Sequence, residues 1–405
     1  MRIAIVSYWC VPYTGGVSTY VLALRKGLQD RGHEVDILSH DGTGTNYHNM
    51  DKNVWLNKEF VLRPIRDQIA RQYNDKVGGY DPWLAAMKAE RLAFRQALSV
   101  FTLNNYDIIH AQDVISAICV SEVKPAGTPL VVTLHGRLAA EWEYQGAIAN
   151  GSASWQWAHE LDRFGSTVGD RVIMPSQWLL KRYDSFRKAN EQTDIVPYGM
   201  DTIAFLRAAA IPSANSGKEG GKLIVCPARL DPVKGHHVLL QALAALASHR
   251  SDWICWLVGD GPLRGHLEQL AIQFGLQNRV RFLGHRNDMP ALLKEADFVV
   301  VPSIHDNTPF VVMEAQVSGK AIIASEVGGI PEMIADGENG LLFPPSRADL
   351  LHAAINRLLD DDSLRIRLAN QARLDGLRKW PINLMTGRTV ALYERTLLAA
   401  QGGNR

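Results

Sequence analysis

The chain lacks an excess of charge of either sign. Among its 405 residues, 43 Lys and Arg balance 42 Asp and Glu, which gives a formal net charge of +1. A surface that binds nucleic acid needs a clear excess of basic residues, so we expect no nucleic-acid partner. The hydrophobic share of 46% and the charged share of 21% are instead typical of an ordinary globular protein.

The chain is also poor in cysteine and has no long apolar run. Its four cysteines are far apart, and no pair has the spacing of metal ligands (Cys10, Cys119, Cys226 and Cys255). We therefore expect buried thiols in a reducing compartment and no metal site. No window approaches the roughly 18 apolar residues of a membrane span. Residues 1–9 lack the length and the cleavage site of a signal peptide, so we predict a cytoplasmic protein.

No G-x-G-x-x-G loop follows the first apolar run, which argues against a hydride-transferring dehydrogenase. The chain is nevertheless too long for one ordinary core, so two domains are expected. Short apolar runs alternate with helical patterns in two series, at 2–9, 33–40, 106–112, 129–136 and 171–176, and at 222–230, 252–260, 279–284, 297–303 and 320–326. Apolar runs joined by helices are typical of parallel sheets covered on both faces.

The two series predict an α/β protein with two doubly wound, Rossmann-like domains that face a central cleft. We place the domains at residues 1–200 and 201–382, and the Ser- and Gly-rich stretch 208–221 reads as a linker. Ligands of such sheets bind at the carboxyl ends of the strands. The candidate site residues all follow predicted strands in this way.

The stretch PSIHDNTPFVVMEAQVSG, residues 302–319, places two acids around the start of one predicted helix. Asp306 and Glu314 lie eight positions apart, a little over two helical turns. We expect Thr308 to cap this helix and Pro309 to occupy its first turn. Asp306 would then sit just before the helix and Glu314 on it, where both carboxylates can accept hydrogen bonds from hydroxyl groups.

Positive charge and exposed amides accompany these acids. Phe310 and Val311 offer backbone N–H groups at the helix start, which favour an anion. Arg229 ends a strand and Lys234 follows five positions later, so both can neutralise a diphosphate. The alternative is a solvated basic loop in which Arg229 forms a salt bridge with Asp231.

Several weaker signals lie at other strand ends. Gly15 and Gly16 follow the first strand and let backbone amides approach a phosphate or sugar, although a plain turn also uses glycine. His135 ends another strand, where it can donate a hydrogen bond, act as acid or base, or serve only as a satisfied structural histidine. Gly259 permits a tight turn, and the backbone after Leu283 can contact a nucleobase edge.

The order of these loops resembles that of the family-four retaining glycosyltransferases, which have the two-Rossmann-domain GT-B architecture. The matching segments span nearly the whole chain: YTGG…RGHEV, VVTLHG, IVPYGMD, ARLDPVKG, VGDGP, VRFLG and PSIHDNTPFVVMEA. The family signature is a glutamate, seven residues and a second glutamate. Glu314 matches the second, whereas Asp306 stands at the first and is one methylene shorter, about 1.5 Å less in reach. The family often has glycine where Pro309 stands. Proline has no backbone N–H to offer, so the phosphate contact would come from the amides of Phe310 and Val311.

The resemblance implies roles for the candidate residues. Glu314 would hold the ribose, and Asp306 the hydroxyls of the transferred sugar, where the shorter side chain affects specificity. The other donor contacts would come from Gly15, Gly16, His135, Arg229, Lys234, Gly259 and the loop after Leu283. A last helix within 383–405 would cross back and complete the N-terminal domain, which would carry the acceptor.

The implied function is transfer of a hexose-type sugar from a nucleoside diphosphate to a saccharide or lipid-linked acceptor, with retention and without a metal or cofactor, in bacterial polysaccharide or glycolipid assembly. Two alternatives stay open: a sugar-nucleotide 2-epimerase of the same fold, and a catalytically silent sugar-nucleotide-binding module. Residues 54–102 carry eight Lys or Arg against five Asp or Glu, near Trp55, Phe60 and Trp83. This region suits peripheral contact with the inner membrane, or is a solvated surface with ordinary core aromatics.

Overall fold

The computed structural model describes residues 1–74, 81–186, 192–213 and 221–402. The chain divides into two compact units, one comprising Met1–Gly199 with Ile382–Arg405 and the other Met200–Pro381. The stretch 208–221 is not the linker that we predicted, because it falls inside the second unit; its residues 214–220 lie outside the described part of the chain. Within the described ranges, no helix combines the length and the apolar character needed to cross a bilayer.

The first unit is built on a mixed eight-stranded sheet with the order β4-β3-β2-β1-β5-β6-β7-β8. Six neighbouring strands run parallel to one another: β2, β1, β5, β6, β7 and β8. At the edge next to β2, β3 and β4 form an antiparallel hairpin that we did not predict. The bounds are β1 (Arg2–Cys10), β2 (Glu34–His40), β3 (Asn46–Asn49), β4 (Val54–Asn57), β5 (Ile108–Ala111), β6 (Leu130–Thr133), β7 (Arg171–Met174) and β8 (Thr193–Ile195).

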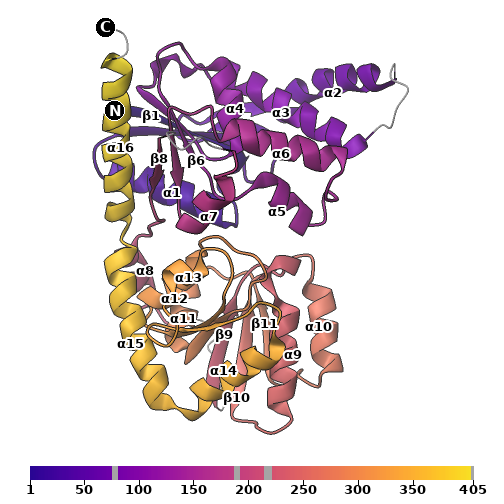
Figure 1. The fold of residues 1–405 in the computed structure, drawn as a ribbon, viewed down its shortest axis with the longest axis vertical. Helices are drawn as coiled ribbons and strands as arrows, with labels where there is room; N and C mark the ends of the chain where they lie inside the picture. Colours follow the sequence, from indigo (N-terminus) through magenta and orange to yellow (C-terminus); the bar gives the residue numbers. More distant parts are fainter. Residues whose placement is uncertain (75–80, 187–191, 214–220, 403–405) are drawn as a thin grey trace. The chain divides into compact units, whose positions relative to one another are not determined.

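Helices cover both faces of this sheet (Figure 1). They are α1 (Gly16–Gln29), α2 (Lys58–Asn74), α3 (Pro82–Val100), α4 (Val114–Val123), α5 (Leu138–Tyr144), α6 (Ala153–Gly165), α7 (Gln177–Tyr183) and α16 (Ile382–Gly402). The C-terminal helix α16 packs on α1, where a Cβ at Gly27 would meet the Thr386 side chain. Arg31 then donates to the Asn383 carbonyl oxygen at 2.9 Å, so the last helix belongs to the first unit.

The second unit has a six-stranded, wholly parallel sheet with the order β11-β10-β9-β12-β13-β14. Its strands are β9 (Lys222–Pro227), β10 (Trp253–Val258), β11 (Val280–Gly284), β12 (Phe298–Val301), β13 (Ala321–Ser325) and β14 (Leu341–Phe343). β10, β12 and β13 are buried along their whole length, since both faces of the sheet are covered. This explains why they read as continuous apolar runs.

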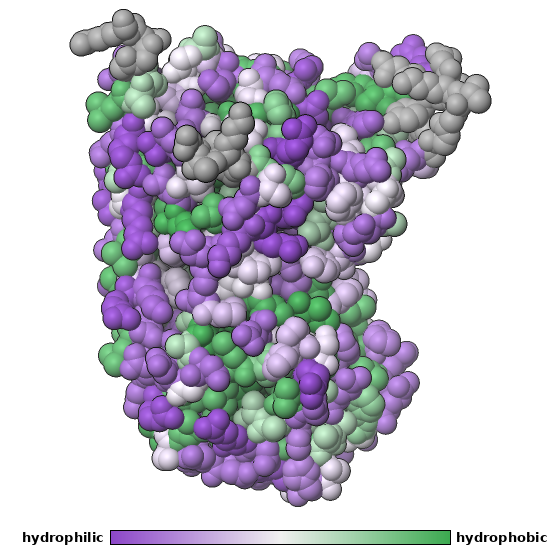
Figure 2. Space-filling model, in the orientation of Figure 1, coloured by the Kyte–Doolittle hydropathy of each residue, from purple (hydrophilic) through white to green (hydrophobic). Residues whose placement is uncertain are grey.

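The helices of the second unit are α8 (Thr202–Ala208), α9 (His236–Ala247), α10 (Arg264–Gln273), α11 (Met289–Glu295), α12 (Phe310–Val317), α13 (Ile330–Met333), α14 (Ala348–Asp360) and α15 (Asp362–Lys379). Figure 2 shows hydrophobic residues interspersed with polar ones over the visible face of this unit. Two doubly wound α/β units confirm the predicted fold class. They also identify where a ligand is expected, because in each sheet the strand order reverses at one point: between β1 and β5 in the first unit, and between β9 and β12 in the second.

Candidate functional site

Several candidate residues lie in the loops at these two reversal points: Gly15 and Gly16 follow β1, Lys234 follows β9 and Asp306 follows β12. In the second unit, the loops that follow β9 and β12 are joined through their backbones. Ile304 N–H donates to the Val233 carbonyl oxygen at 2.7 Å. Gly235 has φ +68°, and a Cβ there would lie 1.9 Å from the Pro302 carbonyl oxygen. The two loops therefore approach so closely that a side chain at position 235 cannot be accommodated.

This approach brings one predicted cation to one predicted acid. Lys234 Nζ lies 2.7 Å from Asp306 Oδ2, and Ser303 Oγ donates to the same oxygen at 3.2 Å. The two charged side chains are 26% and 13% exposed, so the pair is sheltered but open on one side. Lys234 is thus fixed beside the carboxylate and still has ammonium hydrogens to offer to a second anion.

Arg229 behaves differently from Lys234. Its side chain is 47% exposed, and Nε donates to Asp231 Oδ2 at 2.5 Å. This is the local salt bridge that the sequence left open as an alternative. The structure therefore joins Lys234 to Asp306, whereas Arg229 pairs with its own loop.

The helix that carries Glu314 begins later than expected. Pro309 has φ −70° and ψ 126°, so it is the extended N-cap residue of α12 and not part of its first turn. Thr308 does not cap the helix: no side chain does so. The first helical residues are Phe310 and Val311, whose backbone N–H groups point out of the start of α12.

Glu314 is partly buried on α12, and burial raises the pKa of its carboxyl group to about 7. Within the described residues, no hydrogen bond or ion pair of its carboxyl is found. Burial removes water from a carboxylate, so hydrogen bonds donated by hydroxyl groups stabilise its ionised form. Glu314 is therefore suited to bind a pair of hydroxyl groups.

The Asp306 loop is supported by two glycines of the loop that follows β13. Gly328 has φ +61°, and a Cβ there would lie 1.5 Å from the Asp306 carbonyl oxygen. Gly329 N–H donates to the Asn307 carbonyl oxygen at 2.8 Å. The Gly-Gly pair after β13 thus holds the Asp306 loop in place. Its signal was the pair of glycines at a strand end, which we did not connect to the acid.

The two other predicted donor contacts of this unit have structural roles. Gly259 N–H donates to the Gly284 carbonyl oxygen at 2.9 Å, and a Cβ at Gly259 would lie 2.0 Å from the Ala228 carbonyl oxygen. Its amide is therefore used inside the protein, and its lack of a side chain lets the β9 and β10 loops meet. Leu283 lies where the β10–β11 register shifts, as in a β-bulge, which redirects the backbone that follows.

In the first unit, Gly15 and Gly16 lie at the start of α1. Gly15 is the N-cap residue in an extended conformation, and α1 begins at Gly16. A Cβ built on either glycine meets no atom within 4 Å. Neither backbone strain nor packing within the unit requires glycine here, so the space beside this helix start is open.

His135 follows β6 and has partners on both sides of its ring. Nδ1 lies 2.5 Å from the Tyr198 hydroxyl, and Nε2 lies 3.3 Å from Gln112 Oε1. Burial lowers the pKa of His135 to about 3, so the imidazole is neutral at physiological pH. We did not predict Gln112 or Tyr198, although Gln112 follows the β5 run and Tyr198 lies in IVPYGMD.

His110, the other strand-end histidine, is wholly buried. Its ring nitrogens lie 2.6 Å from the Tyr393 hydroxyl and 2.7 Å from Thr133 Oγ1. It therefore fastens α16 to the sheet and takes no direct part in a site.

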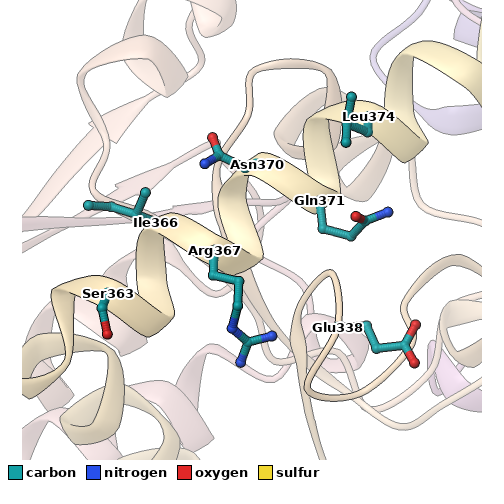
Figure 3. Close-up of a pocket in the computed structure, with 7 residues that line it drawn as sticks. All are labelled: Glu338, Ser363, Ile366, Arg367, Asn370, Gln371 and Leu374. Carbon is teal, nitrogen blue, oxygen red and sulfur yellow. The ribbon is translucent and has the colours of Figure 1, made fainter.

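A hollow of about 900 Å³ lies elsewhere in the second unit, on the exposed side of α15 (Figure 3). It is lined by Glu338, Ser363, Ile366, Arg367, Asn370, Gln371 and Leu374. None of these residues is a candidate, and Leu374 is 65% exposed. The hollow is a shallow surface feature, apart from the loops at the strand reversal.

Comparison with known proteins matches each unit to a family model. Residues 14–203 match the family model described as Glycosyltransferase Family 4, and residues 209–375 match Glycosyl transferases group 1. The chain is 26% identical over 418 residues to the MMP alpha-(1->4)-mannosyltransferase of Mycolicibacterium hassiacum, with 98% of each chain covered.

Two solved structures share the fold. A sucrose-phosphate synthase from Thermosynechococcus elongatus superposes with a TM-score of 0.75 at 20% identity, covering 98% of this chain and 99% of that one. Anabaena HepE in complex with UDP-glucose gives 0.69 at 22% identity, covering 98% and 100%. With both units matched by family models, the chain belongs to the glycosyltransferases of the family-four type, with the GT-B architecture.

Proposed function

We propose that this glycosyltransferase moves a hexose-type sugar from a nucleoside diphosphate to a saccharide or lipid-linked acceptor, with retention of configuration. The observation that carries the proposal is the Lys234–Asp306 pair at the strand reversal of the second unit, with Glu314 on the helix that follows. A cation, two carboxylates and a helix start are complementary to a diphosphate flanked by two sugar rings.

The chemistry follows from where charge develops. As the bond from the sugar to the diphosphate breaks, negative charge grows on the leaving oxygen. The Lys234 ammonium and the Phe310 and Val311 amides supply fixed positive potential for that charge, so this mechanism needs no divalent metal. The acceptor hydroxyl then attacks the oxocarbenium-like sugar from the face that the diphosphate leaves.

The donor class is supported by two relatives. HepE is described in complex with UDP-glucose, and the Mycolicibacterium relative is named a mannosyltransferase. Glu314 would hold the ribose of such a donor, because its carboxyl has no partner among the described residues. Asp306 would accept hydrogen bonds from the transferred sugar while Lys234 turns toward the phosphate.

A panel of sugar nucleotides, read by the change in melting temperature, tests this proposal. One donor should stabilise the chain. Lys234→Ala should abolish that shift and Glu314→Ala should weaken it, whereas Lys294→Ala, at an exposed position of α11, should leave it unchanged. Normal donor binding in both site variants would refute the assignment. Release of an epimerised sugar nucleotide without acceptor would show an epimerase, and tight binding without any turnover would show a silent module.

A lipid-linked acceptor is supported by two exposed aromatic residues of the first unit. Phe60 is 82% and Trp55 53% exposed, whereas Trp83 packs against Trp142 with ring centroids 4.9 Å apart and is not available to lipid. We therefore propose peripheral membrane contact through Trp55 and Phe60. Phe60→Ser should reduce sedimentation with anionic vesicles, and Ile272→Ser, exposed on the second unit, should not; equal loss in both variants would contradict it.

A further inference from the structure

We propose that Trp9, together with Tyr13, forms a subsite of the first unit that binds a sugar ring of the acceptor through the C–H groups on the face of that ring. The inference rests on the proposed function, in which the acceptor is a saccharide or is linked to a lipid. It specifies which part of the acceptor the first unit recognises. A free saccharide and a saccharide attached to a lipid both present such a ring.

The first observation is a bulge at the end of β1. Val6 pairs with Leu38 and Cys10 with His40, so four steps along β1 oppose only two steps along β2. The pairing of β1 with β5, on its other side, also ends at Val6. Residues 7–9 therefore leave the regular ladder, and a bulge of this kind redirects the side chains that it contains.

Buried groups hold the backbone of this bulge in place. Tyr8 N–H donates to Ser116 Oγ at 2.7 Å and to Asp113 Oδ2 at 2.9 Å, both at the start of α4. Trp9 N–H donates to Ser7 Oγ at 3.1 Å, and Ser7 is fully buried. The conformation of the bulge is thus fixed by the protein itself, before any ligand binds.

The Trp9 ring is held on one side and exposed on another. It packs edge-on against the buried Tyr8 ring, with centroids 5.5 Å apart and an angle of 77° between the planes. Trp9 is nevertheless 36% exposed. β1 lies in the middle of a sheet whose two faces are covered by helices, so its side chains reach solvent only at the ends of the strand (Figure 1). The exposed part of the indole therefore lies at the carboxyl end of β1.

Tyr13 is the second exposed aromatic residue after β1. It is 57% exposed, and its N–H donates at 2.8 Å to Oγ of Ser18, a buried residue of α1. The neighbouring Gly15 and Gly16 leave open space, since a Cβ on either meets no atom within 4 Å. The segment after β1 thus presents two aromatic side chains on a backbone that is tied to α4 at one end and to α1 at the other.

These side chains are complementary to a sugar ring. A pyranose has C–H groups on its faces and hydroxyl groups around its rim. The C–H groups pack against the electron-rich face of an indole or phenol ring, and the hydroxyls can reach the indole N–H and the phenol hydroxyl. Trp and Tyr offer this large contact at a low cost in conformational entropy. Because neither side chain is charged, the group recognised here is a neutral ring, and not a phosphate or carboxylate of the acceptor.

Saturation-transfer NMR on the full-length chain tests the subsite, with methyl and octyl glycosides of glucose, mannose and galactose as probes. The ring C–H protons of at least one sugar should receive saturation. Trp9→Ala should weaken binding of that probe about tenfold, and Trp9→Phe should restore part of it. Phe164→Ala, at a 51% exposed aromatic position of α6, is the matched control and should leave the ring signal unchanged.

The probes also distinguish the two sources of the ring. Equal ring saturation in methyl and octyl glycosides would show that a free saccharide is sufficient, whereas ring saturation in the octyl glycosides alone would show a lipid-linked acceptor. Saturation confined to the octyl chain, no ring saturation with any probe, or an unchanged ring signal in folded Trp9→Ala would overturn the proposal. Should Trp9→Ala not fold, Tyr13→Ala serves instead, and an unchanged ring signal in that variant would overturn it equally.

Kinetics and donor binding separate this subsite from the proposed function. Trp9→Ala should raise the KM for the acceptor about tenfold with kcat nearly unchanged, and its stabilisation by the sugar nucleotide should equal that of the unsubstituted chain. Loss of donor binding in Trp9→Ala would overturn the acceptor subsite. Failure of every sugar nucleotide to bind or react would overturn the proposed function, whatever the glycosides show.

Discussion

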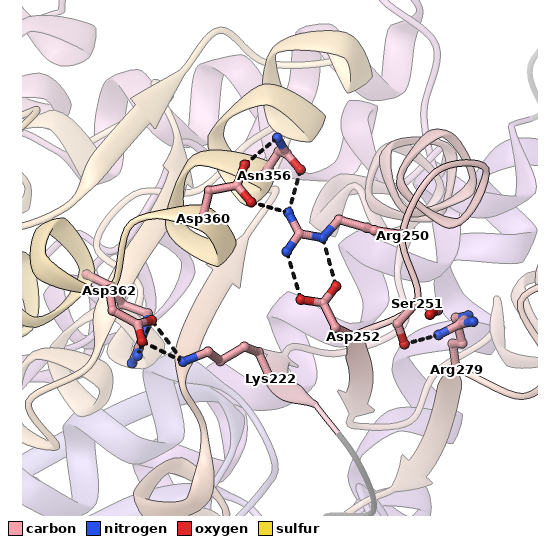
Figure 4. A network of polar contacts seen from close by, with 9 residues as sticks. Lys222, Arg250, Ser251, Asp252, Arg279, Asn356, Asp360 and Asp362 are labelled. Carbon is pink, nitrogen blue, oxygen red and sulfur yellow. Dashed lines mark hydrogen bonds and ion pairs between the residues drawn. The ribbon is translucent and has the colours of Figure 1, made fainter.

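The two ends of the strands in the second unit's sheet use charged residues in opposite ways. We call the end where the strands begin the amino edge, and the end where they finish the carboxyl edge. At the amino edge, Arg250 donates to both carboxylate oxygens of Asp252 at 2.8 Å, to Asp360 at 2.6 Å and to Asn356 at 2.8 Å (Figure 4). Lys222 pairs with Asp362 at 2.8 Å in the same view. These groups satisfy one another.

At the carboxyl edge the charges are only partly satisfied. Lys234 and Asp306 form a single contact at 2.7 Å, and the carboxyl of Glu314 has no partner in the part of the chain that the structure describes. Sheltered groups with unused hydrogen-bonding capacity cost stability, which a bound ligand can restore. The amino edge is therefore built to stabilise the unit, and the carboxyl edge to bind a ligand.

The largest expected effect comes from the glycine beneath Asp306. Gly328→Ala places a Cβ within 1.5 Å of the Asp306 carbonyl oxygen at a left-handed φ of +61°. We expect a loss of about 3 kcal/mol or more in the free energy of unfolding, because strain and overpacking add. The fraction of Gly328→Ala that folds should bind donor poorly, because the Asp306 loop has to move to make room for the new Cβ atom.

Gly337→Ala is the matched control for this change. It has a similar φ of +74°, but its Cβ meets no atom within 4 Å. Only the backbone strain of about 1–2 kcal/mol should appear, without loss of donor binding. Equal effects of the two substitutions, measured by chemical denaturation and donor titration, would show that the loop contact has no special role.

The next effect separates stability from binding. Arg250→Ala removes a partly buried guanidinium that bonds three side chains at once, and should lower the free energy of unfolding by about 1.5–3 kcal/mol. Donor affinity measured below the unfolding temperature should not change. Arg347→Ala removes a fully exposed pair with Asp349 and should leave the free energy of unfolding nearly unchanged. A large loss of donor affinity in Arg250→Ala would contradict the view that the amino edge only stabilises the unit while the carboxyl edge binds the ligand.

The sequence predicted the central parts of both units well. Strands such as β10 and β12 are buried on both faces, so their apolar runs are unambiguous, and the loops that follow them contain the acids and Lys234. The hairpin β3–β4 and the strands β8 and β14 were missed, because their sequences NYHN, VWLN, TDI and LLF are too polar or too short to form a recognisable apolar run.

The finer features of the site depend on contacts between distant segments. The support of Asp306 by Gly328 and the contact of Gln112 with His135 each join residues more than twenty positions apart. The pattern of a single strand or loop contains no information about such partners. The start of α12 was predicted one residue too early for a local reason. Proline has nearly the same φ in the first turn of a helix and in an extended segment, so the sequence does not show which of the two Pro309 adopts.

The smallest effect is a pH dependence that differs in sign between the edges. The folded-state pKa of Glu314 is about 7, above its ordinary value of 4.5, so the folded chain binds the extra proton between these values and loses stability as the pH rises through them. Glu314→Gln removes that loss. The free energy of unfolding of the variant should therefore equal that of the unsubstituted chain at pH 4 and exceed it at pH 8 by roughly 1–3 kcal/mol. The variant should also bind donor more weakly.

Asp252 at the amino edge gives the opposite case. Its hydrogen bonds to Arg250 lower its pKa from 3.8 to about 2, so its contribution is present above pH 4 and is lost as the pH falls toward 2. Asp252→Asn should consequently be less stable than the parent at neutral pH, where Glu314→Gln is more stable. Denaturation curves at pH 4, 6 and 8 compare both variants with the parent. A Glu314→Gln chain that is destabilised at pH 8 would mean that the ionised carboxylate has partners in the folded protein, and the contrast between a satisfied edge and a receptive edge would not hold.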